Sequence, residues 1–377
     1  MTAPLEGVRV LDLSRVIAGP FAGQVLAEMG ADVVKVESPS GDPARRIGPH
    51  QGERSLYFSA VNTGKRGVMV DGRTAAGRAT LTELISAADV VIENFRPSAA
   101  AALGVTASEL LERFPSLVVV SICGYSRRTS RGNEAAYDVS IQAEAGIMSV
   151  TGESGGEPVR AGVPISDLAA GLYAALGAVG GLVRRCLNGE GRHIEVPLMD
   201  STLPLLSYMA TATAYTGHDV GKVGSGHHSI VPYGAFPTSD GWVVIAVLSD
   251  RFWEPLCGAL SLEALLSRED LAENSGRLAA RAEVDTAIAT ATSRLSLEEA
   301  KMLLEAADVP HAPVNNLLQT LDSAYVRERG MVAQVPSPDG TYALVRGPLH
   351  DGRPPRPAPA LGEHTEEVVQ QWLLPAG

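Results

Sequence analysis

The chain has little cysteine: three residues among 377, far apart at Cys123, Cys186 and Cys257. They form neither a CxxC pair nor a disulfide framework, which favours a reducing compartment, and we expect the cytoplasm. The eight histidines are scattered, and only His227 and His228 are adjacent. No HExxH motif or Cys/His spacing suggests a metal site, and nothing indicates a prosthetic group.

A long hydrophobic run and an excess of positive charge are also missing. No apolar leader-like stretch opens the chain, and the longest uncharged apolar run lies between Asp167 and Arg184. This run is shorter than the ~20 residues of a membrane span, and it is mostly Ala and Gly, so it predicts a buried helix. The formal net charge of −12 argues against a nucleic-acid partner. We therefore expect neither a membrane nor a nucleic acid as partner.

The N-terminal half alternates between strand-like and helix-like segments. β-branched runs predict strands at Val8–Leu13, Ala31–Glu37, Gly67–Asp71, Asp89–Ile92 and Leu117–Ile122. Helical patterns lie between them at Phe21–Met29, with Gly30 as C-terminal cap, and at Thr74–Ala87, with Thr74 as N-cap. This alternation predicts βαβ units and a parallel, doubly wound α/β sheet.

The second half predicts a smaller α/β unit. A strand is expected at Gly191–Met199 and a helix at Leu203–Ala214, followed by an irregular, Gly-rich linker at 217–226. Two further strands, Ala235–Thr238 and Trp242–Val247, are joined by a Ser-Asp-Gly turn, and helices follow. We expect a large domain at 1–215, a small domain at 225–320 and a C-terminal segment at 325–377 that returns to the large domain.

Several well-known nucleotide and catalytic motifs are absent. Glu37 ends the second strand, where a ribose-binding acid would lie in a dinucleotide-binding protein. The turn after the first strand, Ser14–Pro20, is not GxGxxG. The pattern therefore resembles an NAD-dependent oxidoreductase in structure only. The segment Asn62–Arg66 has a lysine without the rest of a phosphate-binding P-loop. No GxSxG elbow occurs either.

Cations and one aromatic residue gather where strands are expected to end. They are Lys65, Arg66, Arg73 and the run Asn94-Phe95-Arg96. Ligands bind outside the carboxyl ends of strands in open α/β sheets, and these residue types suit phosphates and a purine. The alternative is that they are solvated loop charges beside a buried phenylalanine.

Asp167 stands directly before the Ala/Gly-rich helix and has two interpretations. Aspartate is a preferred N-cap, so its role could be structural. The same place would stabilise an ionised carboxylate, which can act as a covalent nucleophile toward an acyl group. The small residues Ala169, Ala170 and Gly171 leave room for a substrate or another backbone.

Taken in order, these pieces resemble the family III CoA-transferases, which include formyl-CoA transferase and carnitine CoA-transferase and share a fold with α-methylacyl-CoA racemase. The matching pieces are spread over nearly the whole chain. They include Val10–Leu13, Ala18–Pro20, Gly30–Glu37, Gly41-Asp42, Lys65-Arg66, Glu93–Pro97, Tyr137-Asp138, Gly162 with Asp167, Gly189–Gly191, Asp200, Pro313-Val314 and Leu361–Thr365.

The resemblance implies a Rossmann-like large domain, a smaller α/β domain and an interlocked homodimer. It implies that Asp167 is the nucleophile, forming an aspartyl mixed anhydride from an acyl-CoA. Coenzyme A would be a substrate rather than a bound cofactor. The CoA-contacting positions carried over from the family are Ile17, Ala18, Val70, Asp71, Gly72, Arg73, Asn94, Phe95, Arg96 and Tyr137.

Three positions depart from the pattern of formyl-CoA transferase. Ile17 replaces a catalytic glutamine, and Ala102 and Ala135 replace basic residues. The loop at Gly224–His228 is also less glycine-rich, so formate and oxalate are poor candidates as substrates. Arg96 or Arg45 could supply the missing phosphate contacts, and Arg15, Arg45 and Arg46 could instead bind the distal carboxylate of a dicarboxylate such as succinate.

The racemase branch needs a histidine base where this chain has Tyr137, and the phenol pKa of about 10 suits that role poorly. We therefore expect a CoA-transferase that uses a succinyl-CoA-type donor and a small carboxylic acid. The alternatives are a racemase and a non-catalytic acyl-CoA-binding relative, against which the retained Asp167 argues.

Overall fold

The computed structural model describes residues 3–338, 340–350 and 352–373. Its contacts divide the chain into two compact units. The first unit comprises residues 1–145, 161–210 and 324–377, and the second comprises 146–160 and 211–323. The segment 146–160 thus groups with the second unit, although it interrupts the first unit in sequence.

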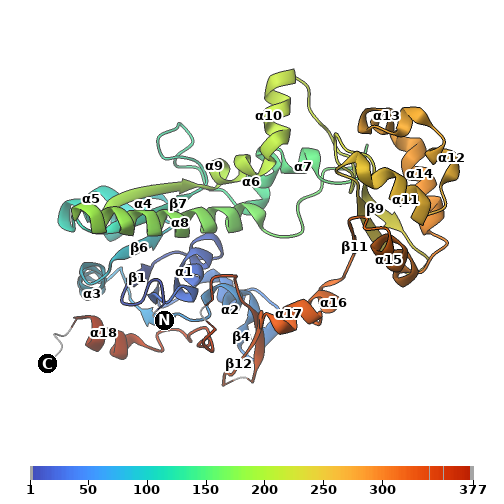
Figure 1. The fold of residues 1–377 in the computed structure, drawn as a ribbon. Coiled ribbons are helices and arrows are strands. Elements are labelled where there is room, and N and C mark those ends of the chain that lie inside the picture. The colour runs from blue at the N-terminus through green and yellow to red at the C-terminus, as the bar shows by residue number, and fades with distance from the viewer. Residues whose placement is uncertain (1–2, 339, 351, 374–377) are drawn as a thin grey trace. The chain divides into compact units, whose positions relative to one another are not determined.

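A six-stranded parallel sheet in the order β5-β2-β1-β6-β7-β8 forms the centre of the first unit (Figure 1). Its strands are β1 (Arg9–Asp12), β2 (Asp32–Glu37), β5 (Arg66–Met69), β6 (Val90–Glu93), β7 (Val118–Cys123) and β8 (Arg192–Pro197). The expected parallel, doubly wound α/β class is confirmed. The strand order reverses between β1 and β6, and the crevice beyond the carboxyl ends of such a pair is where ligands bind in this class.

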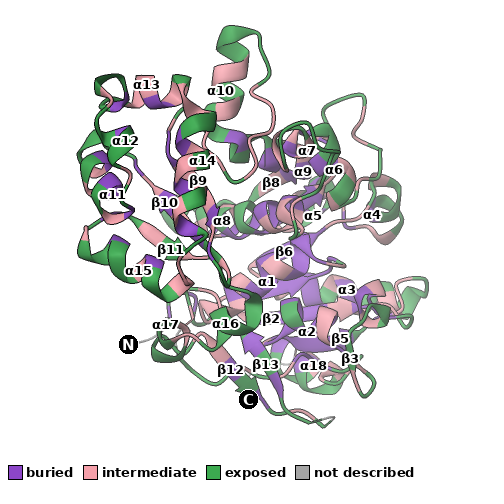
Figure 2. Ribbon diagram, turned by 90° about the vertical axis from the view of Figure 1, so that its right-hand side faces the viewer, coloured by how far each residue is buried: buried purple, intermediate pink, exposed green. Residues whose placement is uncertain are grey.

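The strands are buried and mostly apolar on both faces because helices cover both faces of the sheet (Figure 2). Successive residues alternate between the faces, so Val10 joins one core cluster and Leu11 the other. Helices α1 (Ala18–Glu28) and α8 (Ile165–Asn188) cover the first face. The second face is covered by α3 (Ala75–Ser86), α4 (Pro97–Leu103), α5 (Ala107–Arg113) and α18 (Thr365–Leu373).

Local capping explains several helix boundaries. The Thr74 hydroxyl accepts a hydrogen bond from the N–H of Gly77 at 2.9 Å, which confirms the predicted N-cap of α3. Gly30, with φ +96°, follows the end of α1 in the left-handed region, as expected. Helix α1 begins three residues earlier than predicted, at Ala18, because the turn before it is shorter.

The remaining elements of the first unit are short. They are η1 (Pro43–Arg46), β3 (His50–Gln51), β4 (Arg54–Ser55), α2 (Leu56–Asn62), α6 (Asp138–Glu144), α9 (Leu198–Thr202), η2 (Leu203–Leu206), α17 (Ala324–Glu328), β12 (Val332–Val335) and β13 (Tyr342–Val345). The predicted strand at 191–199 therefore ends at Pro197. The predicted helix at 203–214 is split between η2 and α10 (Ser207–Thr216).

Helix α8 is only partly the buried helix that the sequence predicts. Its small residues, such as Ala170 and Ala174, are buried against α1 and the sheet. Its other side exposes large apolar residues, among them Leu172, Leu176, Val183 and Leu187. By length and composition α8 could span a membrane, but half of its most apolar window is buried, and core helices of soluble proteins meet the same criterion.

The second unit packs helices against a three-stranded antiparallel sheet in the order β11-β10-β9. The predicted hairpin is confirmed: β9 (Tyr233–Pro237) pairs with β10 (Trp242–Ala246), and the N–H of Thr238 donates to the carbonyl of Gly241. The other elements are α7 (Ile147–Val150), η3 (Asp250–Phe252), α11 (Trp253–Ala259), α12 (Glu263–Leu266), η4 (Glu269–Leu271), α13 (Asn274–Ala279), α14 (Arg281–Thr292), α15 (Leu297–Ala306), β11 (His311–Pro313) and α16 (Leu317–Leu321).

Candidate active site

A cavity of about 300 Å³ lies at the carboxyl ends of the sheet strands. Its walls come from the segments that follow β1, β2, β5 and β6, together with leucines of α3 and α4. The lining residues are Leu13, Arg15, Val36–Asp42, Val70–Arg73, Leu81, Phe95 and Leu103. An apolar floor with polar groups at its rim is typical of a small-molecule site.

Five of the predicted CoA-contacting residues line this cavity: Val70, Asp71, Gly72, Arg73 and Phe95. They come together because β5 and β6 are both parallel to β1, so their carboxyl ends meet at one edge of the sheet. The cation of Arg73 is not free, because its guanidinium is paired with Asp71 at 2.8 Å.

The other predicted contacts lie outside the cavity lining. The Asn94 side chain ties the two loops at the switch point, since it bonds both the N–H and the carbonyl of Arg15 at 2.9 Å. Arg96 is the exposed N-cap residue of α4. Ile17 and Ala18 are buried where α1 begins. Tyr137 is 76% exposed and precedes α6.

The three arginines considered for anion binding differ in the number of bonds that they already make within the protein. Arg45 is already occupied: it pairs with Glu37 at 2.5 Å, donates to the carbonyl of Pro359 and stacks over Phe58. Arg15 lies over the Phe95 ring at 5.5 Å and lines the cavity. Arg46 is exposed and donates at 3.3 Å to the carbonyl of Ser40. Arg15 is therefore the best placed of the three to meet a ligand.

Asp167 lies in the first turn of α8, but it does not cap that helix. The cap is supplied by Asp138, whose Oδ1 accepts from the N–H of Ser166 at 2.8 Å and from that of Asp167 at 3.3 Å. The expectation that Asp167 is an N-cap is therefore wrong. The cause is tertiary, because α6 brings a second carboxylate to the position that a local cap would fill.

The Asp167 carboxyl is unusual for its place at a helix N-terminus. Burial, with the Asp138 carboxylate as the second cause, raises its pKa to about 7. The prediction that the helix dipole keeps this carboxylate firmly ionised is therefore wrong. No described residue donates a hydrogen bond to its carboxylate oxygens, so nothing offsets the loss of water.

Gln142 holds Asp138 in place. Its Nε2 donates to Asp138 Oδ2 at 2.6 Å, and its Oε1 accepts from the N–H of Ala161 at 2.8 Å. Gln142 is fully buried, so these bonds replace its water contacts. Both Asp138 and Gln142 belong to the segment that carries the family resemblance, but the sequence did not show that they support Asp167.

Tyr57, on α2, is a site residue that the sequence analysis missed. Burial is the first cause that raises the pKa of its phenol, and the next is the charge of Asp167. Asp138 and Asp42 act in the same direction. Tyr57 is thus a protonated hydroxyl within electrostatic reach of all three carboxylates, and it is available as a hydrogen-bond donor.

Helices α1 and α8 meet closely beside Asp167. A Cβ atom at position 171 would lie 2.7 Å from the carbonyl oxygen of Ala18 and 2.8 Å from the Phe21 ring. Gly171 is therefore required for this close packing. Gly171 lies one helical turn after Asp167 on α8, so Ala18, a predicted CoA contact, lies near Asp167. This agrees with the expectation that small residues here admit another backbone.

Comparisons with known proteins show the family to which the chain belongs. The model of CoA-transferase family III matches residues 5–365. The succinate–glutarate CoA-transferase of Agrobacterium fabrum is 36% identical, with 98% of this chain and 95% of the relative aligned. The human succinyl-CoA:glutarate CoA-transferase is 33% identical over 98% of this chain and 86% of its own length.

A solved structure shows the same fold. A CAIB/BAIF family protein from Brucella suis superposes with a TM-score of 0.89 at 33% identity, covering 99% of this chain and 100% of that protein. The chain belongs to CoA-transferase family III, and it is a CoA-transferase that exchanges CoA between an acyl-CoA and a carboxylic acid. The resemblance read from the sequence is confirmed.

Proposed function

We propose that Asp167 is the nucleophile that receives the acyl group during CoA exchange. The observation that carries this is the half-buried carboxyl without a hydrogen-bond donor, whose pKa is raised to about 7. A desolvated carboxylate is a stronger nucleophile than a hydrated one, and its ionised form is accessible near neutral pH.

The exchange then balances without an external energy source. A carboxylate oxygen of Asp167 attacks the thioester carbon, the C–S bond breaks, and CoA leaves as thiolate with the electron pair. The thiolate attacks the Asp167 carbonyl of the resulting anhydride, which releases the donor acid and leaves an Asp167–CoA thioester. The acceptor carboxylate and the returning thiolate repeat these steps in reverse, yielding the new acyl-CoA and free Asp167.

Each step passes through a tetrahedral oxyanion that needs preorganised donors. The Tyr57 phenol is one candidate, because its raised pKa keeps it protonated at neutral pH. The backbone at Ile17–Ala18, which approaches α8 at Gly171, is a second. The isoleucine at position 17 means that no side-chain amide helps there.

We assign the cavity at the strand ends to the nucleotide portion of CoA. Phe95 and Arg15 offer a stacking surface for the purine. Arg15 lies at the rim for phosphates, and so does Arg73, which stays 83% exposed in its pair with Asp71. Arg45 is excluded from this role by its bond to Glu37. Ala102 and Ala135 are both exposed and carry no charge, so Arg15 is the substitute that the geometry favours.

For the acids, we propose succinyl-CoA as donor and a dicarboxylate of the glutarate type as acceptor. The support is the names of the relatives, succinate–glutarate and succinyl-CoA:glutarate CoA-transferases, together with the full-length similarity. The test is exchange of labelled acids against succinyl-CoA. Failure of succinate, glutarate and branched dicarboxylates to exchange would overturn this assignment and leave the nucleophile assignment intact.

The decisive experiment for Asp167 is intact-mass analysis after mixing the protein with a panel of acyl-CoA thioesters and hydroxylamine. Hydroxylamine converts an aspartyl anhydride or thioester to a stable hydroxamate. We expect a mass gain that peptide mapping places at Asp167 and that is absent in Asp167→Asn. Asp219→Asn is the matched control, because it removes an exposed carboxylate of the second unit and should still be labelled. No adduct, combined with solvent deuterium entering the α-carbon of a branched acyl-CoA, would support a racemase instead.

We also propose that the protein is a homodimer in which α8 is an interface element. Leu172, Leu176, Val183 and Leu187 form an exposed apolar stripe, and Leu176 alone is 67% exposed. Beside it lies a mostly apolar hollow of about 870 Å³, lined by α1, α2 and β13. Leu176→Asp should lower the mass measured by sedimentation, whereas Met302→Asp on α15 should not. An unchanged mass for Leu176→Asp would count against the stripe.

A further inference from the structure

The loop between β1 and α1 contains a strained residue. Val16 has φ +69°, in the left-handed region, and is one of four described non-glycine residues with positive φ. A β-branched side chain is among the least tolerant of this conformation, so the surroundings must impose it. Its neighbour Ile17 is the residue at which the chain turns into α1.

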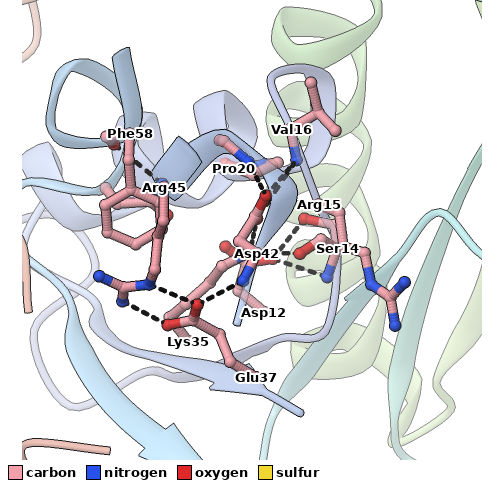
Figure 3. A network of polar contacts seen from close by, with 12 residues as sticks. Asp12, Ser14, Arg15, Val16, Pro20, Lys35, Glu37, Asp42, Arg45 and Phe58 are labelled. Carbon is pink, nitrogen blue, oxygen red and sulfur yellow. Dashed lines mark hydrogen bonds and ion pairs between the residues drawn. The ribbon is translucent and has the colours of Figure 1, made fainter. Parts of the chain in front are cut away.

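The residue that holds Val16 is Asp42. Both of its carboxylate oxygens lie 3.2 Å from the N–H of Val16, which donates to them (Figure 3). Asp42 is itself fixed, because it accepts from the N–H of Ala44 at 2.9 Å and its own N–H donates to Glu37 at 2.8 Å. It is 2% exposed, so this carboxylate has no competing water.

Lys35 binds both Asp42 and the same loop. Its ammonium is fully buried, lies 3.1 Å from Asp42 and donates to the carbonyl of Ser14. The ion pair therefore binds the backbone at Val16 itself and at Ser14, two residues before it. A second buried pair holds the start of the same loop: Asp12 accepts from the N–H of Ser14 at 3.0 Å and pairs with Lys65 at 2.8 Å.

Four buried charges under one loop are not explained by stability alone. Apolar residues of similar volume often serve stability as well as or better than a buried ion pair does. What charges add is directional hydrogen bonding that can enforce a costly backbone conformation. The enforced segment leads directly to Ala18, whose carbonyl packs on α8 at Gly171, one turn from Asp167.

We infer that Asp42, acting with Lys35, is a positioning residue for acyl transfer. It holds Val16 in its left-handed conformation and so sets the Ile17–Ala18 backbone against the start of α8, where the acyl-CoA thioester must meet Asp167. The inference rests on the proposed function of Asp167. Asp42 belongs to the lining of the cavity assigned to CoA, but its carboxylate is fully buried and bonded to the backbone, so it acts through the loop rather than on the substrate.

The test is a double-mutant cycle of Asp42→Ala and Val16→Gly, with Asp32→Ala as control. Asp32 lies on β2, the strand that carries Lys35, and pairs with the buried Arg66 at 2.5 Å, so its loss disturbs an ion pair away from the loop. The readouts are kcat and KM for exchange between the fastest acyl-CoA and acid of the panel, and the thermal midpoint.

We expect Asp42→Ala to lower kcat at least tenfold while KM for the acyl-CoA changes less than threefold. Asp32→Ala should lower the thermal midpoint and leave kcat within twofold. Adding Val16→Gly to Asp42→Ala should restore kcat at least threefold, because glycine adopts positive φ without strain. Val16→Gly alone should retain the wild-type kcat.

A kcat for Asp42→Ala within twofold of that of Asp32→Ala would overturn the inference, as would a loss that Val16→Gly does not relieve. If Asp42→Ala does not fold, Asp42→Asn replaces it: the amide oxygen still accepts from Val16, so kcat should stay within threefold of wild type. A tenfold loss in that variant would show that charge, not loop position, matters. Failure of the proposed nucleophile is read separately, by the absence of hydroxamate at Asp167 in the wild type.

Discussion

Two groups of carboxylates in the first unit lie close to the same loop, yet their surroundings are opposite. Asp12 and Asp42 are fully paired with buried lysines and backbone N–H groups. Asp167 is half-buried, faces a second carboxylate on Asp138 and receives no hydrogen bond from a described residue. The paired carboxylates hold backbone groups in place, whereas the unpaired one is the nucleophile that we propose.

The pKa values express the same contrast. Burial would raise the pKa of Asp12, but the charges of Lys35 and Lys65 outweigh it, and the pKa lies below its ordinary value. Burial lowers the pKa of Lys65 to about 8, against the opposing effect of Asp12. At Asp167 burial acts without an opposing cation, and the pKa is raised to about 7. The neighbouring charge, more than burial, distinguishes the pKa of the paired Asp12 from that of Asp167, the carboxylate that we propose as nucleophile.

The largest effect should come from removing the reactive carboxylate. Asp167→Asn keeps the shape of the side chain but cannot form the anhydride, so we expect exchange of CoA to fall by about 10³-fold or more. Steady-state exchange assays measure this, and a circular dichroism spectrum like that of the wild type would show that the fold is intact. Exchange within tenfold of wild type would remove Asp167 from the mechanism.

The next largest effect should come from breaking the buried ion pair between Lys65 and Asp12, which should lower the free energy of unfolding. Lys65→Met leaves Asp12 with one lysine fewer in the protein interior, and we expect a loss of about 3–5 kcal/mol in the free energy of unfolding. Urea denaturation measures it. Lys301→Met, which breaks an exposed pair with Glu298, should cost about 0–1 kcal/mol. Equal losses in the two variants would contradict the contrast between buried and surface pairs.

Adding a methyl group where α1 and α8 touch should have an intermediate effect on stability. Gly171→Ala forces the α8 backbone away from the carbonyl of Ala18, because the new Cβ would lie only 2.7 Å from that oxygen. We expect a loss of about 1–3 kcal/mol in stability and a lower rate of Asp167 acylation. Gly180→Ala on the same helix meets nothing within 4 Å and serves as the control. An unaffected Gly171→Ala variant would show that α1 and α8 are not tightly packed there.

The smallest effect concerns pH. The acylation rate should rise with pH and level off above about 7, because only the ionised form of Asp167 attacks. Asp138→Asn removes a like charge while its amide oxygen still caps α8, so the midpoint should move to lower pH by about one unit. Burial keeps it above the ordinary value. A midpoint unchanged in Asp138→Asn would mean that burial alone sets the pKa.

Stability should change with pH in the opposite sense. Since the folded-state pKa of Asp167 is raised, the folded form holds its proton up to about 7, while the unfolded chain loses it near 4. The contribution of Asp167 to stability is therefore lost as pH rises through that window. Asp167→Asn should be more thermally stable than the wild type at pH 8, with the difference closing at pH 5.

Much of this architecture could be predicted from residue patterns. Runs of Val and Ile between turn residues predicted the parallel strands, and Thr74 predicted the start of α3. The residues after β5 and β6 were correctly grouped, because the carboxyl ends of parallel strands must meet. The family resemblance identified the class of enzyme, and it supplied Asp167 as the expected nucleophile.

The remaining features depend on contacts between distant segments. Asp138 rather than Asp167 caps α8 because of where α6 packs. The local sequence around residue 167 does not predict this contact. The role of Tyr57 follows from electrostatic contact with carboxylates on other elements. The exposed side of α8 was missed because an Ala- and Gly-rich run looks buried, whereas only its small residues face the sheet.

By itself, then, the sequence determined the order of strands and helices, the edge of the sheet where the cavity lies and the family, because each of these follows from local periodicity or from ordered motifs. The tertiary structure decided which carboxylates are paired and which is left unpaired. Pairing depends on distances of a few ångströms between segments tens of residues apart, and that is where the electrostatic energy of a buried charge is set.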